Sequence, residues 1–243
     1  MATGPRLNLS IAEKRFAGAP SALYAGLEIE IAPSSVVALI GPSGIGKSTL
    51  LRMIAGIDAD FSGSITVDGM AAAVAPTPGF VFQDPRLLPW LTAADNIRAA
   101  DPQCTAEQAG KALDLVGLGG SGELYPHQLS GGMQRRVALA RALVVNARLL
   151  LLDEPFVSLD RTLVAEIHEL FGRIIAEARP TVLFVSHLTD DAARLADRAI
   201  LLDHRPAVVV ADIALPVPPA QRDETVLAQY RKMLDAHFAR LGE

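Results

Sequence analysis

Apolar and polar residues alternate along the first part of the chain. The apolar members of this pattern are Leu7, Leu9, Ile11, Leu23, Leu27, Ile29 and Ile31. A period of two residues is typical of strands with one buried face, so we expect antiparallel strands between Leu7 and Ile31. The turn at 13–18 carries one aromatic residue, Phe16. This side chain could pack in the core, or it could form a platform on which an adenine ring stacks.

Short apolar runs without polar interruption occur farther along the chain. These runs are 36–40, 149–152, 181–185, 199–202 and 207–210, and two shorter strands are expected at 65–69 and 79–83. Runs of this length are typical of buried strands rather than of helices. Helical periodicity lies between several of them, over 92–145, 162–178 and 190–197. The pattern predicts an α/β domain with a mostly helical insertion between two of its strands.

The end of the chain combines a proline-rich segment, 215–219, with an amphipathic helix expected over 223–241. The apolar face of that helix consists of Val226, Tyr230, Leu234, Phe238 and Leu241. Its polar face mixes acidic and basic residues, whereas a helix that lies on a membrane is usually rich in Lys and Arg there. We therefore expect the helix to pack against the rest of the protein.

Composition narrows the class of protein. Half of the 243 residues are apolar and the net charge is −5, which argues against a nucleic-acid-binding protein. Cys104 is the only cysteine, so we expect neither an internal disulfide nor a cysteine-ligated metal, and a small apolar role for this side chain. We expect no signal peptide in residues 1–16 and no membrane-spanning segment.

The chemistry is centred on a glycine-rich loop between the apolar run 36–40 and a helix that starts near residue 50. Its residues are Gly41, Pro42, Ser43, Gly44, Ile45, Gly46, Lys47, Ser48 and Thr49. In a phosphate-binding P-loop, glycines let backbone N–H groups turn toward an anion, and the helix start adds its unpaired amides. Lys47 would reach the outer phosphates, and Ser48 would offer a hydroxyl to Mg²⁺. The alternative is a glycine turn that merely joins a strand to a helix.

A second glycine loop lies inside the helical insertion. Ser130, Gly131 and Gly132 belong to the run 129–134, which precedes an amphipathic helix over 135–143. Such a helix start could bind an anion, but Ser-Gly-Gly is also a common helix cap. The residues alone leave both interpretations open.

Polar residues follow two of the buried strands. Asp153 and Glu154 end the run 149–152, where they could be solvated charges or functional carboxylates. Beside a P-loop, one acid could hold Mg²⁺ through its water shell and the next could orient or deprotonate the attacking water. His187 follows the run 181–185 and would lie on the same rim as the phosphate loop. Asp160 is a plausible cap of the helix that follows it.

Taken together, these motifs resemble the nucleotide-binding subunit of ABC transporters, over about 7–215. The resemblance rests on the order P-loop, Gln83, the 129–134 signature (Leu-Ser-Gly-Gly-Met-Gln), Leu149 to Glu154, Ser158-Leu159-Asp160, and His187. It implies a P-loop NTPase (RecA-like) core with an antiparallel β-subdomain and an inserted helical subdomain. The implied division is a core at about 1–83 and 147–215, a helical subdomain at about 84–146, and a C-terminal linker and helix at 216–243.

The resemblance also implies roles in binding ATP and Mg²⁺. Phe16 would stack on adenine, and the P-loop would hold the phosphates. Lys47 would bind the β- and γ-phosphates, Thr49 the α-phosphate and Ser48 the Mg²⁺. Asp160 is counted among the nucleotide-binding residues.

The implied catalytic set is Glu154, His187, Lys47 and Gln83. Glu154 would be the general base, and His187 would hold the γ-phosphate. Gln83 would sense the γ-phosphate and Mg²⁺, and Asp153 would support Mg²⁺ through water. Ser130 and Gly132 would contact the γ-phosphate bound on a second copy, so that two chains form a head-to-tail dimer around ATP, with Gly131 in the same loop.

The 81–90 segment resembles the ATPases of nitrate, sulfonate and taurine importers. The resemblance implies an importer of a small anion, with an importer of a pyrimidine or thiamine precursor as the alternative. An exporter, a soluble ABC ATPase and a P-loop kinase are the rival interpretations. We expect permease subunits to dock near Arg86 to Trp90, with Trp90 exposed as an anchor rather than in the core. The same resemblance implies a periplasmic or extracellular substrate-binding protein as an indirect partner, and a peripheral place on the cytoplasmic face of the plasma membrane.

The sequence departs from the family pattern at two places. Ser34-Ser35 stands where Gly-Glu is usual, which we expect to affect only a turn. Leu188 follows His187 where an aspartate is usual, so the sequence does not predict which residues contact His187.

Overall fold

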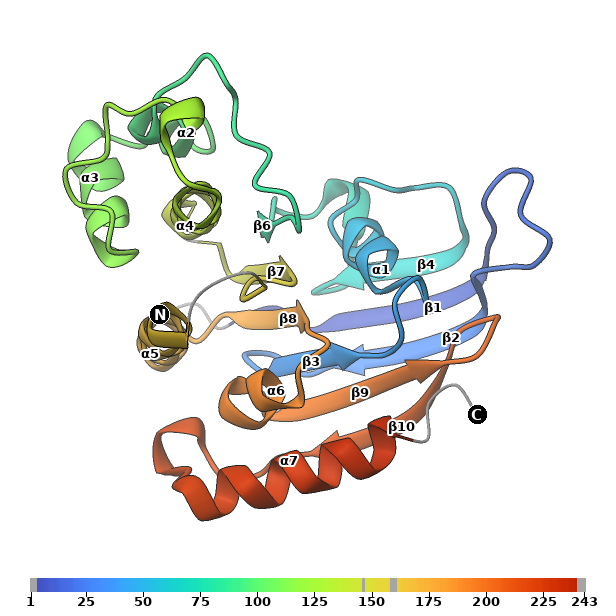
Figure 1. Cartoon of the computed structure of the whole chain (residues 1–243). Coiled ribbons are helices and arrows are strands. Elements are labelled where there is room, and N and C mark those ends of the chain that lie inside the picture. The colour runs from blue at the N-terminus through green and yellow to red at the C-terminus, as the bar shows by residue number, and fades with distance from the viewer. Residues whose placement is uncertain (1–3, 146, 158–160, 240–243) are drawn as a thin grey trace.

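The chain folds around a six-stranded sheet whose central strands are parallel (Figure 1). In the computed structural model, which describes residues 4–145, 147–157 and 161–239, the strand order is β10-β9-β3-β8-β7-β6. The strands are β3 (Val36–Ile40), β6 (Gly79–Val81), β7 (Leu149–Asp153), β8 (Thr181–Val185), β9 (Arg198–Asp203) and β10 (Val208–Ala214). Neighbours from β6 to β9 pair in parallel, and β10 pairs antiparallel with β9. The carboxyl ends of the parallel strands therefore meet along one edge, where α/β folds bind ligands.

The continuous apolar runs are the centre of this sheet, as predicted. Every residue of β3, β7 and β8 is buried. Strands buried on both faces lose the alternation that a half-exposed strand keeps. The first helix, α1 (Lys47–Ile54), follows β3 directly and buries Leu50, Leu51, Met53 and Ile54.

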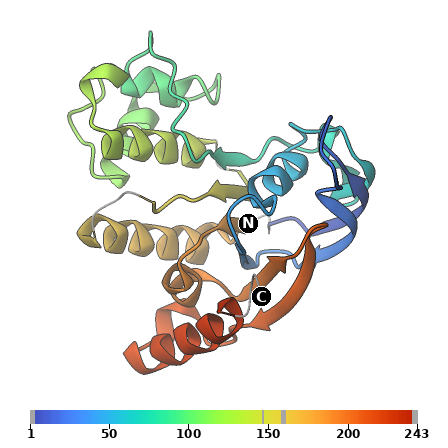
Figure 2. The same ribbon diagram turned by 45° about the vertical axis from the view of Figure 1, so that its right-hand side comes forward.

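The predicted antiparallel strands form a second sheet of order β2-β1-β4-β5. Its strands are β1 (Leu7–Lys14), β2 (Tyr24–Ile31), β4 (Ser62–Val67) and β5 (Met70–Ala71). The inward residues of β1 and β2 share one apolar cluster with Val37 and Leu39 of β3 and with α1. The two sheets thus enclose α1 between them (Figure 2). Ser34, at the departure from the family pattern, lies in the turn between β2 and β3 with a φ of 55°. Its Oγ accepts a 2.9 Å hydrogen bond from Gly4 N and its own N–H donates at 2.9 Å to Thr181 Oγ1, so its contacts extend beyond the turn.

Three helices lie between β6 and β7 in the chain, where a helical insertion was predicted (Figure 1). They are α2 (Ala93–Arg98), α3 (Ala106–Leu115) and α4 (Gly131–Val144), with a 3-10 turn, η2, at Pro126–Gln128. The insertion is less helical than its periodicity suggested, because 99–105 and 116–125 join the helices as loops and turns. Thr92, Thr105 and Ser130 cap the three helix starts with their side chains.

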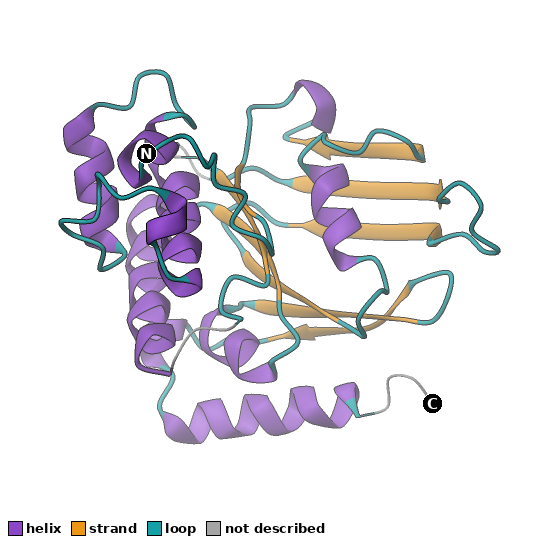
Figure 3. Cartoon of the chain, turned by 45° about the horizontal axis from the view of Figure 1, so that its top comes forward, coloured by secondary structure: helices purple, strands orange, loops and turns teal. Residues whose placement is uncertain are grey.

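The face of the large sheet that lies away from α1 is covered by α5 (Arg161–Ala178), α6 (Thr189–Leu195) and α7 (Glu224–Phe238), as Figure 3 shows from above. The packing role predicted for the C-terminal helix is confirmed, since Tyr230 and Leu234 are buried. Its inner face also includes Leu227, whereas Val226 and Phe238 lie at the margin of the core and are partly buried. Leu241 lies outside the described residues. Among the helices that the structure describes, none is long and apolar enough to cross a bilayer.

The proline-rich segment is fastened to the core by Arg222. Its guanidinium donates hydrogen bonds to four backbone oxygens, those of Ala193, Ala196, Leu215 and Val217. Val217 N in turn donates to the Tyr230 hydroxyl oxygen at 3.0 Å. The segment therefore joins β10 to α7 in a fixed conformation.

Cys104, in the helical insertion, is buried, as expected for a small apolar side chain.

Candidate functional site

The glycine-rich loop joins β3 to α1, the context that a P-loop requires. Lys47 is 7% exposed, and its Nζ donates hydrogen bonds to the backbone oxygens of Gly41 and Pro42, both at 2.8 Å. These bonds hold the ammonium group across the mouth of its own loop. Burial lowers the pKa of Lys47, while the carboxylates of Glu154 and Asp153 act in the opposite direction. An anion in the loop would therefore meet an incompletely solvated positive charge.

Tyr24, a residue that the sequence analysis did not single out, supports the loop from below. Its hydroxyl donates a 2.7 Å hydrogen bond to Gly46 O, and its side chain is fully buried. Gly46 has a φ of 113°, and a Cβ there would lie 2.5 Å from the Tyr24 hydroxyl oxygen. Only glycine fits this position. Burial raises the pKa of Tyr24 above its ordinary value, although a backbone hydrogen bond opposes the shift, so the hydroxyl keeps its proton.

Arg205 is a second support that the sequence analysis missed. Its Nη2 donates a 2.9 Å hydrogen bond to Gly44 O across a sequence separation of 161 residues. Nothing in the local sequence around Arg205 marks it, because its partner is a backbone atom that any residue type would provide. Tyr24 was missed for a different reason: it stands at the start of a strand and looks like an ordinary core residue.

Two acids stand at the carboxyl end of β7, beside the loop. Ser48 Oγ donates a 2.8 Å hydrogen bond to Asp153 Oδ1. Burial raises the pKa of Asp153; the hydrogen bond from Ser48 opposes this shift, and the neighbouring charge of Glu154 adds to it. A buried carboxylate of this kind is stabilised by a cation.

Glu154 has an unusual backbone for a residue with a side chain. Its φ is 52°, in the left-handed region, and its N–H donates a 3.1 Å hydrogen bond to Val185 O at the end of β8. Such a conformation costs roughly 1 kcal/mol or more, and it persists where the surroundings enforce it. It is the point at which the chain leaves β7 and turns the Glu154 side chain toward the neighbouring strand ends.

Gln83 and His187 meet Glu154 from the two sides. Gln83 Nε2 donates a 3.2 Å hydrogen bond to Glu154 Oε2, and His187 Nδ1 lies 3.9 Å from Glu154 Oε1. Gln83 follows β6, Glu154 follows β7 and His187 follows β8, three adjacent parallel strands. The structure therefore brings together Lys47, Ser48, Gln83, Asp153, Glu154 and His187 at one edge of the sheet.

The oxygen ligands at this place suit Mg²⁺, which binds with water and phosphate ligands, better than a metal ion coordinated only by protein side chains. Ser48 and Asp153 present adjacent oxygen atoms, which are the ligands that Mg²⁺ prefers. Within the described ranges, no group of three or more His, Cys, Asp or Glu side chains could hold a metal ion. A site with few protein ligands suits Mg²⁺, which usually keeps several waters and binds substrate phosphates.

The Ser130 loop lies at the start of α4, in the helical insertion. Ser130 Oγ accepts a 3.2 Å hydrogen bond from Met133 N, so the cap predicted from the sequence is present. Ser130 and Gly131 are exposed. No hydrogen bond or ion pair between described residues joins this loop to the P-loop, so the two anion-binding candidates do not meet within one chain.

Phe16 lies in the loop between β1 and β2 and is 48% exposed, so the interpretation of Phe16 as a core residue is wrong. Lys14 Nζ lies 5.0 Å from the centre of the Phe16 ring.

Trp90 is 68% exposed, which agrees with the exposed anchor and excludes the core alternative. Asp160 lies outside the described residues.

Comparisons with known proteins converge on one family. The model of the ABC transporter family matches residues 24–157. The chain is 44% identical over 219 residues to an aliphatic sulfonates import ATP-binding protein, SsuB 2, of Xanthomonas axonopodis pv. citri, covering 89% of this chain and 73% of that one. A protein of the same name from Burkholderia cenocepacia is 39% identical over 237 residues, covering 96% of this chain and 87% of that one.

Solved structures agree with the sequence comparison. The ATP-binding cassette MJ0796, solved as a dimer in a post-hydrolysis state bound to ADP and Pi, superposes with a TM-score of 0.78 at 28% identity. The match covers 86% of this chain and 98% of the cassette. The expected fold, a P-loop NTPase core with an antiparallel subdomain and inserted helices, is confirmed.

Proposed function

The chain belongs to the ABC transporter family as an ATP-hydrolysing subunit, and we propose that it energises an importer of small organic anions, with aliphatic sulfonates as the substrate class. One observation carries the proposed chemistry: Lys47, Ser48, Gln83, Asp153, Glu154 and His187 converge at the carboxyl edge of the sheet. The substrate class follows from relatives at 39–45% identity that are named as aliphatic sulfonate import proteins.

In this proposal the P-loop binds the triphosphate of ATP. Lys47 exchanges its contacts with Gly41 O and Pro42 O for the β- and γ-phosphate oxygens, and Thr49 contacts the α-phosphate. Tyr24 and Arg205 keep the loop in place, because they hold Gly46 O and Gly44 O from outside the site. Phe16 stacks on adenine, a role that its exposure permits.

Mg²⁺ would be held by Ser48, with Gln83 beside it and Asp153 acting through water. When bound, Mg²⁺ supplies charge neutralisation at the phosphate oxygens. Asp153 favours a cation at this place because its buried carboxylate is poorly solvated. The hydroxyl of Ser48 holds Asp153 in position until a cation is there.

Hydrolysis is assigned to Glu154 and His187. The Glu154 carboxylate accepts a proton from the attacking water, and His187 holds the γ-phosphate that the water attacks. Gln83 donates to Glu154 Oε2 and so orients the carboxylate. Because Gln83 begins the segment that leads into the helical insertion, a movement of that insertion would change the orientation of the base.

The Ser130 loop completes the site on another copy of the chain. Ser130 and Gly132 contact the γ-phosphate across a head-to-tail dimer, with Gly131 beside them. Two observations support this arrangement: the loop is exposed and has no bond to its own P-loop among the described residues, and MJ0796 is dimeric. Loss of the γ-phosphate then removes contacts from both chains and opens the dimer.

The segment from Arg86 to Trp90 is the proposed docking site for the permease subunits. Its backbone is held firmly, since Arg141 donates to the oxygens of Pro85 and Arg86, and the buried Asn96 side chain exchanges hydrogen bonds with the backbone of Leu88. Trp90 is free to contact a partner because most of its surface is exposed. The same proposal places the chain on the cytoplasmic face of the plasma membrane, with a periplasmic binding protein as an indirect partner.

The proposed division of the chain follows the same lines. The ATPase core comprises about 1–83 and 147–215, the helical subdomain about 84–146, and the C-terminal linker and helix 216–243. The insertion of α2, α3 and α4 between β6 and β7 supports this division.

The substrate class is tested by reconstitution. The chain is assembled with its own permease and binding protein in proteoliposomes, and ATP hydrolysis is measured with added alkanesulfonate, taurine, nitrate or a thiamine precursor. We expect alkanesulfonates to stimulate hydrolysis most. Stimulation by nitrate alone, or by the thiamine precursor alone, would show that aliphatic sulfonates are the wrong substrate class. The absence of hydrolysis with any ligand would contradict the assignment to an importer.

A further inference from the structure

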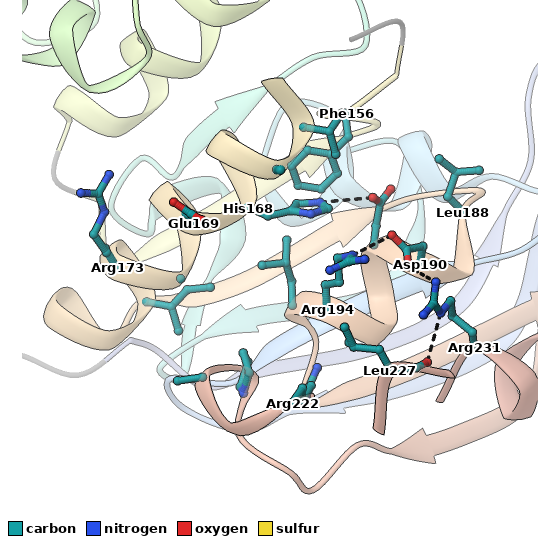
Figure 4. Close-up of a pocket in the computed structure, with 18 of the residues that line it drawn as sticks. Phe156, His168, Glu169, Arg173, Leu188, Asp190, Arg194, Arg222, Leu227 and Arg231 are labelled. Carbon is teal, nitrogen blue, oxygen red and sulfur yellow. Dashed lines mark hydrogen bonds and ion pairs between the residues drawn. The ribbon is translucent and has the colours of Figure 1, made fainter. Parts of the chain in front are cut away.

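A buried polar cluster lies next to His187, where α5 and α6 meet the end of β8. Its members are His168 of α5, Ser186 at the end of β8, and Asp191 of α6, with exposures of 9%, 2% and 3%. His168 and Asp191 also line a groove of about 1440 Å³ between α5, α6 and α7 (Figure 4). Polar groups in an apolar interior are costly unless they are paired, so this cluster needs an explanation.

The pairing of Ser186 holds the loop that carries His187. Ser186 Oγ donates a 2.6 Å hydrogen bond to Asp191 Oδ2 and accepts a 3.0 Å hydrogen bond from Leu188 N. Both contacts span His187, because each joins Ser186, which precedes it, to a residue that follows it. They fix the backbone at which the His187 side chain leaves the sheet, although an aspartate is absent from position 188.

His168 connects this loop to the segment that follows the general base. Its Nε2 lies 3.3 Å from Asp191 Oδ1, an ion-pair distance that Figure 4 shows as a dashed line. Its ring packs edge-on against Phe156, with 4.6 Å between the ring centres. Phe156 comes two residues after Glu154 and is itself buried against Phe171 and Phe184. One imidazole thus contacts Phe156, in the segment after β7, and Asp191 of α6, which is itself bonded to Ser186 after β8.

We infer that His168 and Asp191 are positioning residues, which set His187 at its distance from Glu154 through Ser186 and Phe156. The inference rests on the proposed function, in which His187 and Glu154 act on the same γ-phosphate. Neither positioning residue touches the nucleotide. Their effect is to keep His187 Nδ1 and Glu154 Oε1 at the 3.9 Å separation that the structure shows.

Positioning of this kind affects the turnover step more than binding. The P-loop and its supports bind ATP without contact to His168 or Asp191, so nucleotide affinity should survive their loss. A shift of about 1 Å in a reacting group can lower a rate by roughly 100-fold. Loss of the cluster should therefore lower kcat and leave KM nearly unchanged.

The test compares two substitutions at one position in the full-length chain. His168→Leu keeps an apolar side chain but removes the contact with Asp191, whereas His168→Gln keeps a nitrogen donor in reach of it. We expect His168→Leu to lower kcat about 10-fold or more, with KM for ATP within about 2-fold, and His168→Gln to recover most of the rate. Thr189→Val is the matched control, since it breaks a 2.6 Å hydrogen bond from α6 to Asp235 of α7 without touching Ser186. The control should keep the parent kcat.

A second comparison separates this inference from the proposed function. In a His187→Ala background there is no imidazole to position, so adding His168→Leu should change the remaining kcat by less than about 2-fold. An equal loss with and without His187 would overturn the inference and leave the proposed function standing. If His187→Ala alone leaves kcat unchanged, the role of His187 fails, and the inference fails with it.

Folding of the variants is checked by thermal unfolding. If His168→Leu does not fold, Ser186→Ala tests the same link with a smaller change, since it removes the bonds to Asp191 and Leu188 together. The same fall in kcat with unchanged KM is expected. A parent-like kcat for Ser186→Ala, or equal rates for His168→Leu and His168→Gln, would overturn the inference.

Discussion

Ser48 Oγ donates a 2.8 Å hydrogen bond to Asp153 Oδ1, which links the start of α1 to the end of β7 across 105 residues. The bond places a buried carboxylate beside the P-loop before any nucleotide is present. The pKa of Asp153 lies above its ordinary value of 3.8, chiefly because burial disfavours the charged form. The site is therefore less stable without a cation than it would be with a neutral side chain there.

Asp153→Asn should stabilise the nucleotide-free protein at neutral pH. The folded state raises the pKa of Asp153, so it binds the proton more tightly than the unfolded chain and loses stability as the pH rises through that pKa. Asparagine removes the charge and keeps an oxygen for Ser48. We expect a Tm about 2–4 °C above the parent at pH 7, with the difference shrinking as the pH falls toward 4.

Asp153→Asn should also abolish ATP hydrolysis and the Mg²⁺-dependent part of ATP protection. Asp114→Asn, on an exposed position of α3, is the control and should change neither property. Phosphate release measures hydrolysis, thermal scans with and without MgATP measure the protection, and thermal scans from pH 4 to pH 7 measure the stability of the nucleotide-free protein. A Tm difference that is independent of pH, or a less stable variant at pH 7, contradicts the account of Asp153.

Tyr24→Phe should loosen the P-loop. The substitution leaves Gly46 O without its buried hydroxyl donor, and one lost hydrogen bond of this kind costs about 1–2 kcal/mol of unfolding free energy. We expect urea unfolding to show that loss and the KM for ATP to rise several-fold. Tyr125→Phe removes a hydroxyl from an exposed tyrosine and is the control. Equal effects of the two substitutions would show that the Tyr24 hydroxyl has no special role.

Phe16→Ala should weaken ATP binding without destabilising the fold. The ring is half exposed, so its removal costs little packing. Stacking of a base on an aromatic ring is worth about 1–3 kcal/mol, so we expect KM to rise about 10-fold. Phe16→Trp should restore a KM close to the parent value. If neither substitution alters the KM for ATP, adenine does not stack on Phe16.

Trp90→Ala should uncouple hydrolysis from transport. The isolated chain should keep its Tm, because Asn96 and Arg141 hold the segment from Pro85 to Leu88 without help from the indole. In proteoliposomes with the permease, we expect ATP hydrolysis to lose its response to substrate. Transport that remains coupled to ATP hydrolysis in this variant would show that the docking site lies away from Trp90.

The sequence alone predicts most of the architecture, for reasons that can be named. Alternation in β1 and β2, and continuous apolar runs in β3, β7 and β8, reflect burial on one face or on two. These patterns depend only on the order of neighbouring residues, so they can be read from the sequence without knowledge of tertiary contacts. The P-loop and the acids after β7 are recognisable because their chemistry requires particular residue types at fixed positions.

The supporting contacts could not be predicted in the same way. Tyr24 and Arg205 act on backbone oxygens, so no partner side chain signals them. His168 is one of five histidines, and it stands on a different helix from Asp191, with the whole of β8 between them in the chain. Only the three-dimensional packing of α5 on α6 brings these groups together, and the left-handed φ of Glu154 likewise depends on the tertiary structure.

The central claim is that ATP is hydrolysed at a site shared by two copies of the chain. Glu154→Gln removes the general base and leaves the P-loop and the Ser130 loop intact, so MgATP should be bound and not consumed. We predict that this variant forms a dimer with MgATP and remains monomeric with MgADP, as measured by sedimentation over a range of protein concentrations. Binding of MgATP by a chain that stays monomeric at every concentration would contradict the account.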